Sequence, residues 1–204
     1  KELTLLVALG APLAAVHGHG AAEVERVYLD ARALCQQVES APQLFPVLGG
    51  LSLFSLVRAD LQTAHQLASQ CLHLAGQSND AAMLLKAHAS LGTILYFQGE
   101  FTQAQEHLRQ AKALHAPLRQ RDLTFAYGLD PGVECRYMAG WNLWMLGYPD
   151  QGLRESEEAV TLARTLGHAN TLATALYYAT VLHGHRWEWQ AMQARAEEVL
   201  AVAT

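Results

Sequence analysis

The sequence predicts an all-α protein, an α-solenoid made of about five antiparallel helix pairs. Three observations lead to this class. Ala, Leu, Gln, Glu and Arg dominate the chain, and apolar residues recur at three- and four-residue spacing in segment after segment. Sustained period-two alternation and Asn-Gly or Asp-Gly turns, which would predict strands and hairpins, are missing from the sequence. A pattern of small and apolar residues also repeats around four turn positions, which indicates a repeat architecture.

The first two helix pairs are expected in residues 1–40 and 41–76. The first pair joins the apolar segment "ELTLLVALGAPLAAV" to the amphipathic segment "AAEVERVYLDARALCQQV". The apolar segment is shorter than the roughly 20 residues that cross a bilayer, and Gly10 and Pro12 interrupt it. Only Lys1 precedes it and no cleavage site follows, so we interpret it as a buried helix rather than a signal peptide or membrane anchor. The second pair turns at Ala59, in "LVRADLQTAHQLASQCL".

The third pair, in residues 79–115, shows the repeat most clearly. In "HASLGTILYFQGEFTQAQEHLRQAKAL" the first helix carries Leu91-Gly92, Gly99 marks the turn, and the second helix carries Ala104, Leu108 and Ala111. Small residues on facing sides let two antiparallel helices approach closely. Cys71 occupies the same small position in the preceding pair, and we interpret it as a buried apolar residue rather than a reactive thiol.

The fourth and fifth pairs are expected in residues 130–167 and 169–204. Asp130 is predicted to cap the N-terminus of a helix whose first residue is Pro131, and Gly140 is predicted to be a close-packing position. The turn frame recurs at Gly147 and Trp187, so the copies are separated by 40, 48 and 40 residues. A connector between residues 114 and 130 explains the longer step, and we expect it to be mobile or protruding.

This order of small and bulky residues resembles the tetratricopeptide repeat (TPR). In that repeat a Trp, Leu-Gly and Tyr pattern on the first helix meets Ala, a bulky residue and Ala on the second. His88 and Leu95 stand at the Trp and Tyr positions, so the match is partial. The resemblance implies a right-handed solenoid with the first helix of each pair on the concave side.

Three longer stretches resemble a narrower group. "LCQQVESAPQLFPVLGGLSLFSLVRADLQTAHQLASQCLHLA", "YGLDPGVECRYMAGWNLWMLGYPDQGL" and "LATALYYATVLHGHRWEW" are similar to the C-terminal helical-repeat region of large bacterial predicted ATPases of signal transduction, in which cyclase or protein kinase domains often come first. The resemblance covers essentially residues 1–204 and implies one cytoplasmic TPR-like domain that is a fragment of a longer protein. Catalytic residues of those families lie in domains outside these 204 residues.

Composition and motifs argue against several functions. The net charge of −5 offers no footprint for nucleic acid. Three widely spaced cysteines fit a reducing compartment, and the absence of any Gly-Lys dipeptide excludes a phosphate-binding GxxxxGK[ST] loop. The pairs His17/His19 and His183/His185 lack further ligands nearby, so we interpret them as helix ends rather than metal sites. We expect no catalytic residue, metal or cofactor in this chain.

An aromatic stripe on the first helices is the candidate binding surface. The TPR positions that face the groove are occupied by Lys86, Ala89, Thr93, Tyr96 and Phe97 in the third pair, by Glu134, Tyr137, Trp141, Trp144 and Met145 in the fourth, and by Tyr177 and Val181 in the fifth. From these we select as candidate binding residues Tyr96, Phe97, Tyr137, Trp141, Trp144, Met145 and Tyr177. Such side chains can anchor a partner, but aromatic stripes at helical spacing also form internal packing, and the sequence leaves both interpretations open.

The favoured function is a non-catalytic regulatory module that holds a protein, a peptide or a neighbouring domain of the same polypeptide. The alternative is a sensor of a small effector that controls an ATPase or cyclase. An autonomous enzyme is the least favoured hypothesis, because no constellation of residues supports it.

Overall fold

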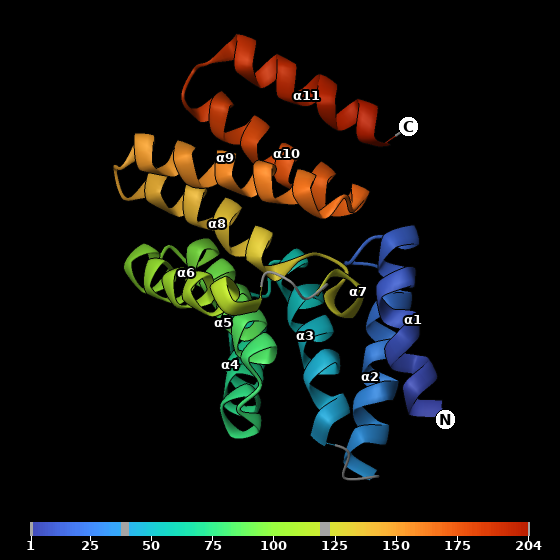
Figure 1. Ribbon diagram of the computed structural model, residues 1–204. Helices are drawn as coiled ribbons and strands as arrows, with labels where there is room; N and C mark the ends of the chain where they lie inside the picture. Colours follow the sequence, from blue (N-terminus) through green and yellow to red (C-terminus); the bar gives the residue numbers. More distant parts are fainter. Residues whose placement is uncertain (1, 38–40, 119–122, 204) are drawn as a thin grey trace.

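The computed structural model describes residues 2–37, 41–118 and 123–203. All the regular structure in these ranges is helical, and the long helices follow one another as antiparallel pairs (Figure 1). The pairs are α1 (Glu2–His17) with α2 (Ala22–Gln37), α3 (Ala41–Val57) with α4 (Leu61–Ser78), α5 (Ala81–Phe97) with α6 (Phe101–His115), α8 (Pro131–Met145) with α9 (Pro149–Leu166), and α10 (Ala169–His185) with α11 (Trp189–Ala203). The predicted all-α solenoid is confirmed.

The turn inside each of the last four pairs has one backbone geometry. Ala59, Gly99, Gly147 and Trp187, the four turn positions aligned in the sequence, all have positive φ, between 60° and 84°. At each turn this residue donates its N–H to the carbonyl three residues back, and the next residue donates to the carbonyl five residues back. This pattern is the Schellman motif, which ends a helix and satisfies its last carbonyl groups. The repeat register predicted from the sequence is therefore confirmed.

Replacing Ala59 with glycine is expected to raise the free energy of unfolding by about 0.5–1 kcal/mol. A left-handed conformation costs an L-residue roughly 1–2 kcal/mol, and the greater freedom of glycine in the unfolded chain offsets part of the gain. Ala59 has φ 62° at a turn where the other pairs have Gly99 and Gly147. Chemical denaturation measures the change, and a lower stability of Ala59→Gly would contradict the strain argument.

Glycines set the closest approach between paired helices. A Cβ atom on Gly140 would lie 2.9 Å from the carbonyl oxygen of Gly152, and one on Gly152 would lie 2.6 Å from the carbonyl oxygen of Gly140. In the third pair, a Cβ atom on Gly92 would lie 2.7 Å from the Leu108 side chain. Both predicted close-packing positions on first helices are thus confirmed. A larger side chain at Gly140 meets backbone and would move the helices apart, whereas one at Gly92 would first displace the Leu108 side chain.

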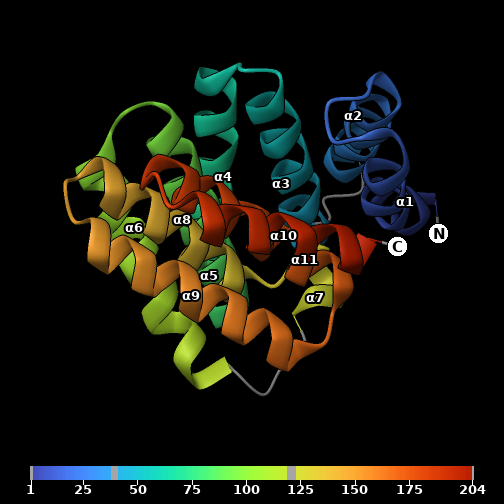
Figure 2. The same cartoon turned by 90° about the horizontal axis from the view of Figure 1, so that it is seen from above.

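Stacking of the pairs places the first helices on the inside of a curved array. α3 packs against α5, α5 against α8, and α8 against α10. Seen from above, α4, α6 and α9 lie at the periphery while α5, α8 and α10 lie nearer the middle (Figure 2). Ion pairs span the wider gaps between second helices: Lys112 of α6 pairs with Glu155 of α9, and Arg195 of α11 pairs with Glu157 of α9 at 2.7 Å.

The connector between α6 and α8 differs from its prediction in the parts that the structure describes. Leu118, in the short 3₁₀ helix Ala116–Leu118, and Leu123 are buried in the main core rather than protruding. The helix α7 (Thr124–Tyr127) ends on Tyr127, whose ring meets Phe45 of α3 edge-on at 6.5 Å. Tyr127 packs against two core clusters and so joins the N-terminal and C-terminal parts of the array. Residues 119–122 lie outside the described part of the chain.

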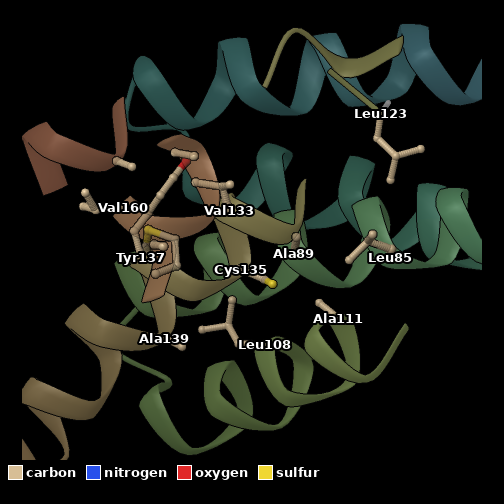
Figure 3. Packing of buried hydrophobic residues seen from close by; sticks show 14 of the residues in the cluster. Leu85, Ala89, Leu108, Ala111, Leu123, Val133, Cys135, Tyr137, Ala139 and Val160 are labelled. Atoms are coloured by element: carbon tan, nitrogen blue, oxygen red, sulfur yellow. The ribbon is translucent and has the colours of Figure 1, made fainter. Parts of the chain in front are cut away.

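The largest core cluster lies where α5, α6 and α8 meet, with further residues from α9 and α10. Figure 3 shows Cys135 of α8 beside Leu108 and Ala111 of α6, which belong to this cluster. The start of α8 is buried as well: Asp130 caps it by accepting the N–H of Val133 at 2.9 Å, and Pro131 is its first residue, both as predicted. Because α8 is buried from its first turn, it forms the fixed base for the inner surface.

Candidate functional site

The candidate residues occupy repeated positions on the inner helices. Phe97 and Met145 both stand two residues before a turn glycine, and Tyr96 and Trp144 stand three residues before it. Because the turns share one geometry and α5, α8 and α10 lie side by side, residues in equivalent positions line up across the array. The local Schellman turns therefore determine where the aromatic side chains meet.

Four rings form a continuous cluster on the inner helices, here called the aromatic ladder, which consists of Tyr96, Tyr137, Trp141 and Tyr178. The rings of Tyr137 and Tyr178 stack with centroids 4.0 Å apart, and the Trp141 ring lies 4.5 Å from that of Tyr178. Trp141 also donates its indole N–H to the Tyr178 carbonyl at 2.9 Å, and its ring lies 6.0 Å from that of Tyr96. The ladder therefore ties α5, α8 and α10 together, and aromatic pairs of this kind add stability beyond their buried area.

Trp144 belongs to a second group of rings at the turn end of the inner helices. Its ring is nearly parallel to that of His185 of α10, with centroids 6.2 Å apart. The His185 ring also meets Trp141 edge-on at 6.3 Å. Trp144 is thus half-buried by a contact between pairs, and part of its face stays open to solvent.

Three candidate side chains remain largely in solvent. The exposed fractions of Phe97, Met145 and Tyr177 are 45%, 49% and 53%. Two of them rest on the aromatic ladder: Phe97 meets Tyr96 edge-on at 5.2 Å, and Tyr177 meets Tyr178 edge-on at 5.4 Å. The seven predicted residues therefore differ in their exposure to solvent. Tyr137 is buried, Tyr96, Trp141 and Trp144 are half-buried, and Phe97, Met145 and Tyr177 are exposed.

An ion pair lies at the other end of the inner helices. Lys86 of α5 and Glu134 of α8 are equivalent in the repeat register, and their Nζ and Oε2 atoms are 2.6 Å apart with both side chains mostly buried. Burial, with the nearby Glu134 carboxylate, raises the pKa of Tyr137 well above its usual value and that of Tyr178 to about 12. Both tyrosines are therefore neutral at physiological pH, and the ladder presents an uncharged surface.

Two residues of this site were not predicted from the sequence. Tyr178 lies outside the TPR positions used to select candidates, yet it contacts Tyr137, Trp141 and Tyr177. His185 stands two residues before the Trp187 turn, the position of Phe97 and Met145, so completing the groove positions of the fifth pair would have found it. The repeat register gives no comparable indication that Tyr178 belongs to the site.

A shallow depression of about 550 Å³ borders the exposed part of the surface. Its walls are residues from the start of α4 and from the turn between α5 and α6, namely Leu61, His65, Leu95, Phe97, Gln98, Glu100 and Gln103. A hydrogen bond of 2.8 Å between His65 and Gln98 joins the two pairs there. The depression is open and largely polar, which suits a side chain of a bound segment better than an enclosed small molecule.

Potential metal ligands and apolar helices form no further site in residues 2–37, 41–118 and 123–203. In these ranges, no group of three or more His, Cys, Asp or Glu side chains could hold a metal ion. No described helix combines the length and apolarity needed to cross a membrane. Burial raises the pKa of the Cys71 and Cys135 thiols to about 12, which fits their interpretation as packing residues.

Comparison with known proteins supports the fold at low sequence identity. No family model matches the chain, and no curated protein matches its sequence. Among solved structures, it resembles BtubC from P. vanneervenii, with 12% identity, a TM-score of 0.65, and coverage of 95% of this chain and 76% of that one. It also resembles a putative kinesin light chain of Podosopora anserina with nearly identical TPR-like repeats, with 14% identity, a TM-score of 0.63, and coverage of 100% and 96%.

A third similar structure is a Rap protein complexed with Competence and Sporulation Factor. The identity is 11% and the TM-score 0.70, and the match covers 88% of this chain but only 48% of the Rap protein. All three identities are below 25%, so these likenesses establish the TPR-like solenoid fold and leave the ligand of this chain to be argued from its own residues.

Proposed function

We propose that this chain is a non-catalytic interaction module that binds a protein segment along the inner surface of α5, α8 and α10. The main observation in support of the proposal is that some residues of the aromatic stripe pack against one another while others are exposed. Phe97, Met145 and Tyr177 are exposed on a base whose rings already pack against one another. A rigid base reduces the entropy that binding costs, and large apolar side chains are the usual anchors of interfaces.

The spacing of the surface limits the form of the bound segment. Adjacent packed helices lie about 8–10 Å apart, and a peptide in the polyproline II conformation rises about 3.1 Å per residue with three residues per turn. A peptide that crosses α5 and α8 would therefore place apolar residues about three positions apart against Phe97 and Met145. The two exposed residues are equivalent in the register, which favours such a crossing.

The proposed setting is a cytoplasmic multidomain signalling ATPase or cyclase, in which this module regulates the catalytic domains. This setting comes from the resemblance of three long stretches of sequence to the repeat regions of such proteins. The bound segment would then be a partner protein or a neighbouring domain of the same polypeptide. In the alternative, a small effector occupies the surface instead, and the experiment below separates the two.

The test uses a phage-displayed library of random peptides selected on the 204-residue chain. Selected peptides are synthesised with a fluorophore, and their affinities are measured by fluorescence anisotropy. We expect Phe97→Ala, Met145→Ala and Tyr177→Ala each to weaken binding about 5- to 30-fold, the usual effect of removing an interface anchor. These side chains are already half in solvent, so the variants should keep the melting temperature close to that of the wild type.

Leu29→Ala is the matched control, because Leu29 is similarly exposed but lies on α2, a second helix away from the inner surface. Its peptide affinity should equal that of the wild type. A triple variant combines Phe97→Ala, Met145→Ala and Tyr177→Ala. Selected peptides that bind this triple variant as tightly as the wild type would overturn the proposal. A metabolite thermal-shift screen that stabilises the wild type but not the triple variant, in the absence of selected peptides, would favour the effector sensor.

A further inference from the structure

The depression between the second and third helix pairs has walls that suit one kind of side chain. It is the shallow depression of about 550 Å³ described above, and it lies within the array rather than at one of its ends. Leu61, Leu95 and the half-exposed Phe97 form its apolar walls. Its polar walls are His65, Gln98, Glu100 and Gln103. Such a mixture suits a side chain with an apolar stem and a polar head.

Hydrogen bonds between the pairs fix the orientation of Gln98 and His65. The Leu61 carbonyl can only accept, so the Gln98 atom that contacts it at 3.2 Å is the amide nitrogen. The amide oxygen of Gln98 therefore faces His65 at 2.8 Å, which requires a proton on His65 Nδ1. With Nδ1 as the donor, the Nε2 atom of a neutral ring carries a lone pair. Gln98 thus holds His65 as a hydrogen-bond acceptor.

The polar atoms left over in these walls are all acceptors. Gln103 donates its amide nitrogen to Glu100 Oε2 at 3.3 Å. Within residues 41–118, as far as the structure describes them, the wall atoms that make no hydrogen bond are Glu100 Oε1, Gln103 Oε1 and His65 Nε2. Each of these atoms can accept a hydrogen bond, whereas both glutamine nitrogens already donate one. The occupant that fits them is therefore a donor.

Glu100 carries a charge that is not used inside the protein. It stands directly before α6, at the position that Asp60 occupies before α4. Asp60 caps its helix by accepting the N–H of Thr63, but the Glu100 side chain makes no capping hydrogen bond. Among the described residues, no Lys, Arg or His nitrogen lies within 4.0 Å of the Glu100 carboxylate. This carboxylate is therefore available to a bound cation.

The charges around the depression favour a cation over an anion. A helix N-terminus carries about half a positive charge, and both α4 and α6 begin here. The carboxylates of Asp60 and Glu100 each bring a full negative charge, and the C-terminus of α5 adds about half of one. Arg58 of the α3–α4 turn is directed toward the α1–α2 turn, because a Cβ atom on Gly20 would lie 3.7 Å from its Cδ atom. The negative charges therefore outweigh the positive ones.

We propose that this depression binds an arginine side chain of the segment that crosses the inner surface. The inference rests on the proposed function, since the arginine belongs to the same segment. A guanidinium group offers planar, forked donors to the acceptors of Glu100 and Gln103 and a flat face to the Phe97 ring. Lysine would bring the charge without the fork or the flat face.

The position of the depression places the arginine within the segment. Phe97 lines both the depression and the inner surface, and the depression lies on the α4 side of Phe97, away from Met145 of α8. We therefore expect the arginine within about three positions of the residue that contacts Phe97, on the side away from the residue that contacts Met145.

A small arginine probe tests the depression without any peptide. N-acetyl-arginine N-methylamide is titrated at millimolar concentrations into the isotope-labelled 204-residue chain and followed by NMR. We expect the side-chain amide signals of Gln98 and Gln103 to shift. The citrulline analogue, which has the same shape but no charge, should shift them about fivefold less. Equal shifts with both probes, or no shift with either, would contradict the inference.

Glu100→Gln should reduce the response to the arginine probe about fivefold, because it removes the charge that faces the guanidinium group. Its melting temperature should equal that of the wild type, as the Glu100 side chain does not cap α6. Glu106→Gln is the matched control: it removes the same charge from an exposed site on α6, where Arg109 already pairs with Glu106 at 2.7 Å. A similar loss of response in both variants would mean that net charge, and not the depression, attracts the probe.

The selected peptides test the same site in the bound segment. Replacing their arginine with citrulline should weaken binding to the wild type about 5- to 20-fold, as expected when hydrogen bonds to a charged group are lost. Glu100→Gln should weaken the arginine peptide by a similar factor and leave the affinity of the citrulline peptide unchanged, because the two changes remove one interaction.

The outcomes separate this inference from the proposed function. Peptides that require Phe97 and Met145, but lack arginine or bind Glu100→Gln as tightly as the wild type, would refute the inference and leave the proposed function intact. A response to the arginine probe that requires Glu100, together with peptides that bind the triple variant as tightly as the wild type, would instead refute the proposed function alone.

Discussion

Gly140→Ala is expected to lower the free energy of unfolding by about 2–3 kcal/mol, although the same change in an ordinary helix interior raises it by about 1 kcal/mol. The added methyl group would lie 2.9 Å from the carbonyl oxygen of Gly152 and 3.4 Å from the Cβ atom of Ser156. Neither backbone can move alone, so α8 and α9 must separate. Separation loosens the core around Val160 and Ala159, which are fully buried.

Gly76→Ala is the matched control for this expectation. Gly76 lies inside α4, is exposed, and has no atom within 4 Å of an added Cβ. The control should therefore gain about 0.5–1 kcal/mol from helix propensity and reduced freedom of the unfolded chain. Urea denaturation of both variants gives the comparison. If Gly140→Ala were as stable as Gly76→Ala, the close approach of α8 and α9 would not be a property of the folded protein.

The features that the sequence predicted correctly are those with a local cause. A Schellman turn needs one residue with positive φ at a fixed place, so Gly99 and Gly147 reveal the register, and Ala59 and Trp187 follow from the spacing. Close packing needs small residues on facing sides, which is why Gly92 and Gly140 could be predicted. The N-cap at Asp130 follows from the same kind of short-range chemistry.

Features that depend on contacts between pairs were predicted less well. The connector looked free because residues 114 to 130 lack a long periodic helix, but Leu118 and Leu123 are buried by helices distant in sequence. Likewise, the position of Tyr137 in the register says that it faces inward, whereas its burial depends on Tyr178 of the next pair. A repeat pattern gives the direction of a side chain, and the neighbouring pair decides its exposure.

Trp141→Ala is expected to cost about 3 kcal/mol of folding stability, because truncating a large aromatic residue in a packed site costs roughly 3–5 kcal/mol and Trp141 is half-buried. The variant loses contacts with Tyr96 and Tyr178 and the hydrogen bond to the Tyr178 carbonyl. Trp141→Phe keeps a ring but lacks the indole N–H, so it should cost less, about 1–2 kcal/mol. Thermal and urea unfolding measure both changes.

The expected loss of stability determines which variants can be used to measure binding at the inner surface. If Trp141 stabilises the contact between α8 and α10, then lost binding in Trp141→Ala reports a weakened array as much as a lost contact with the ligand. Phe97→Ala removes an exposed ring and leaves the aromatic ladder in place, so it reports binding alone. A Trp141→Ala variant as stable as the wild type would contradict the packing role of Trp141.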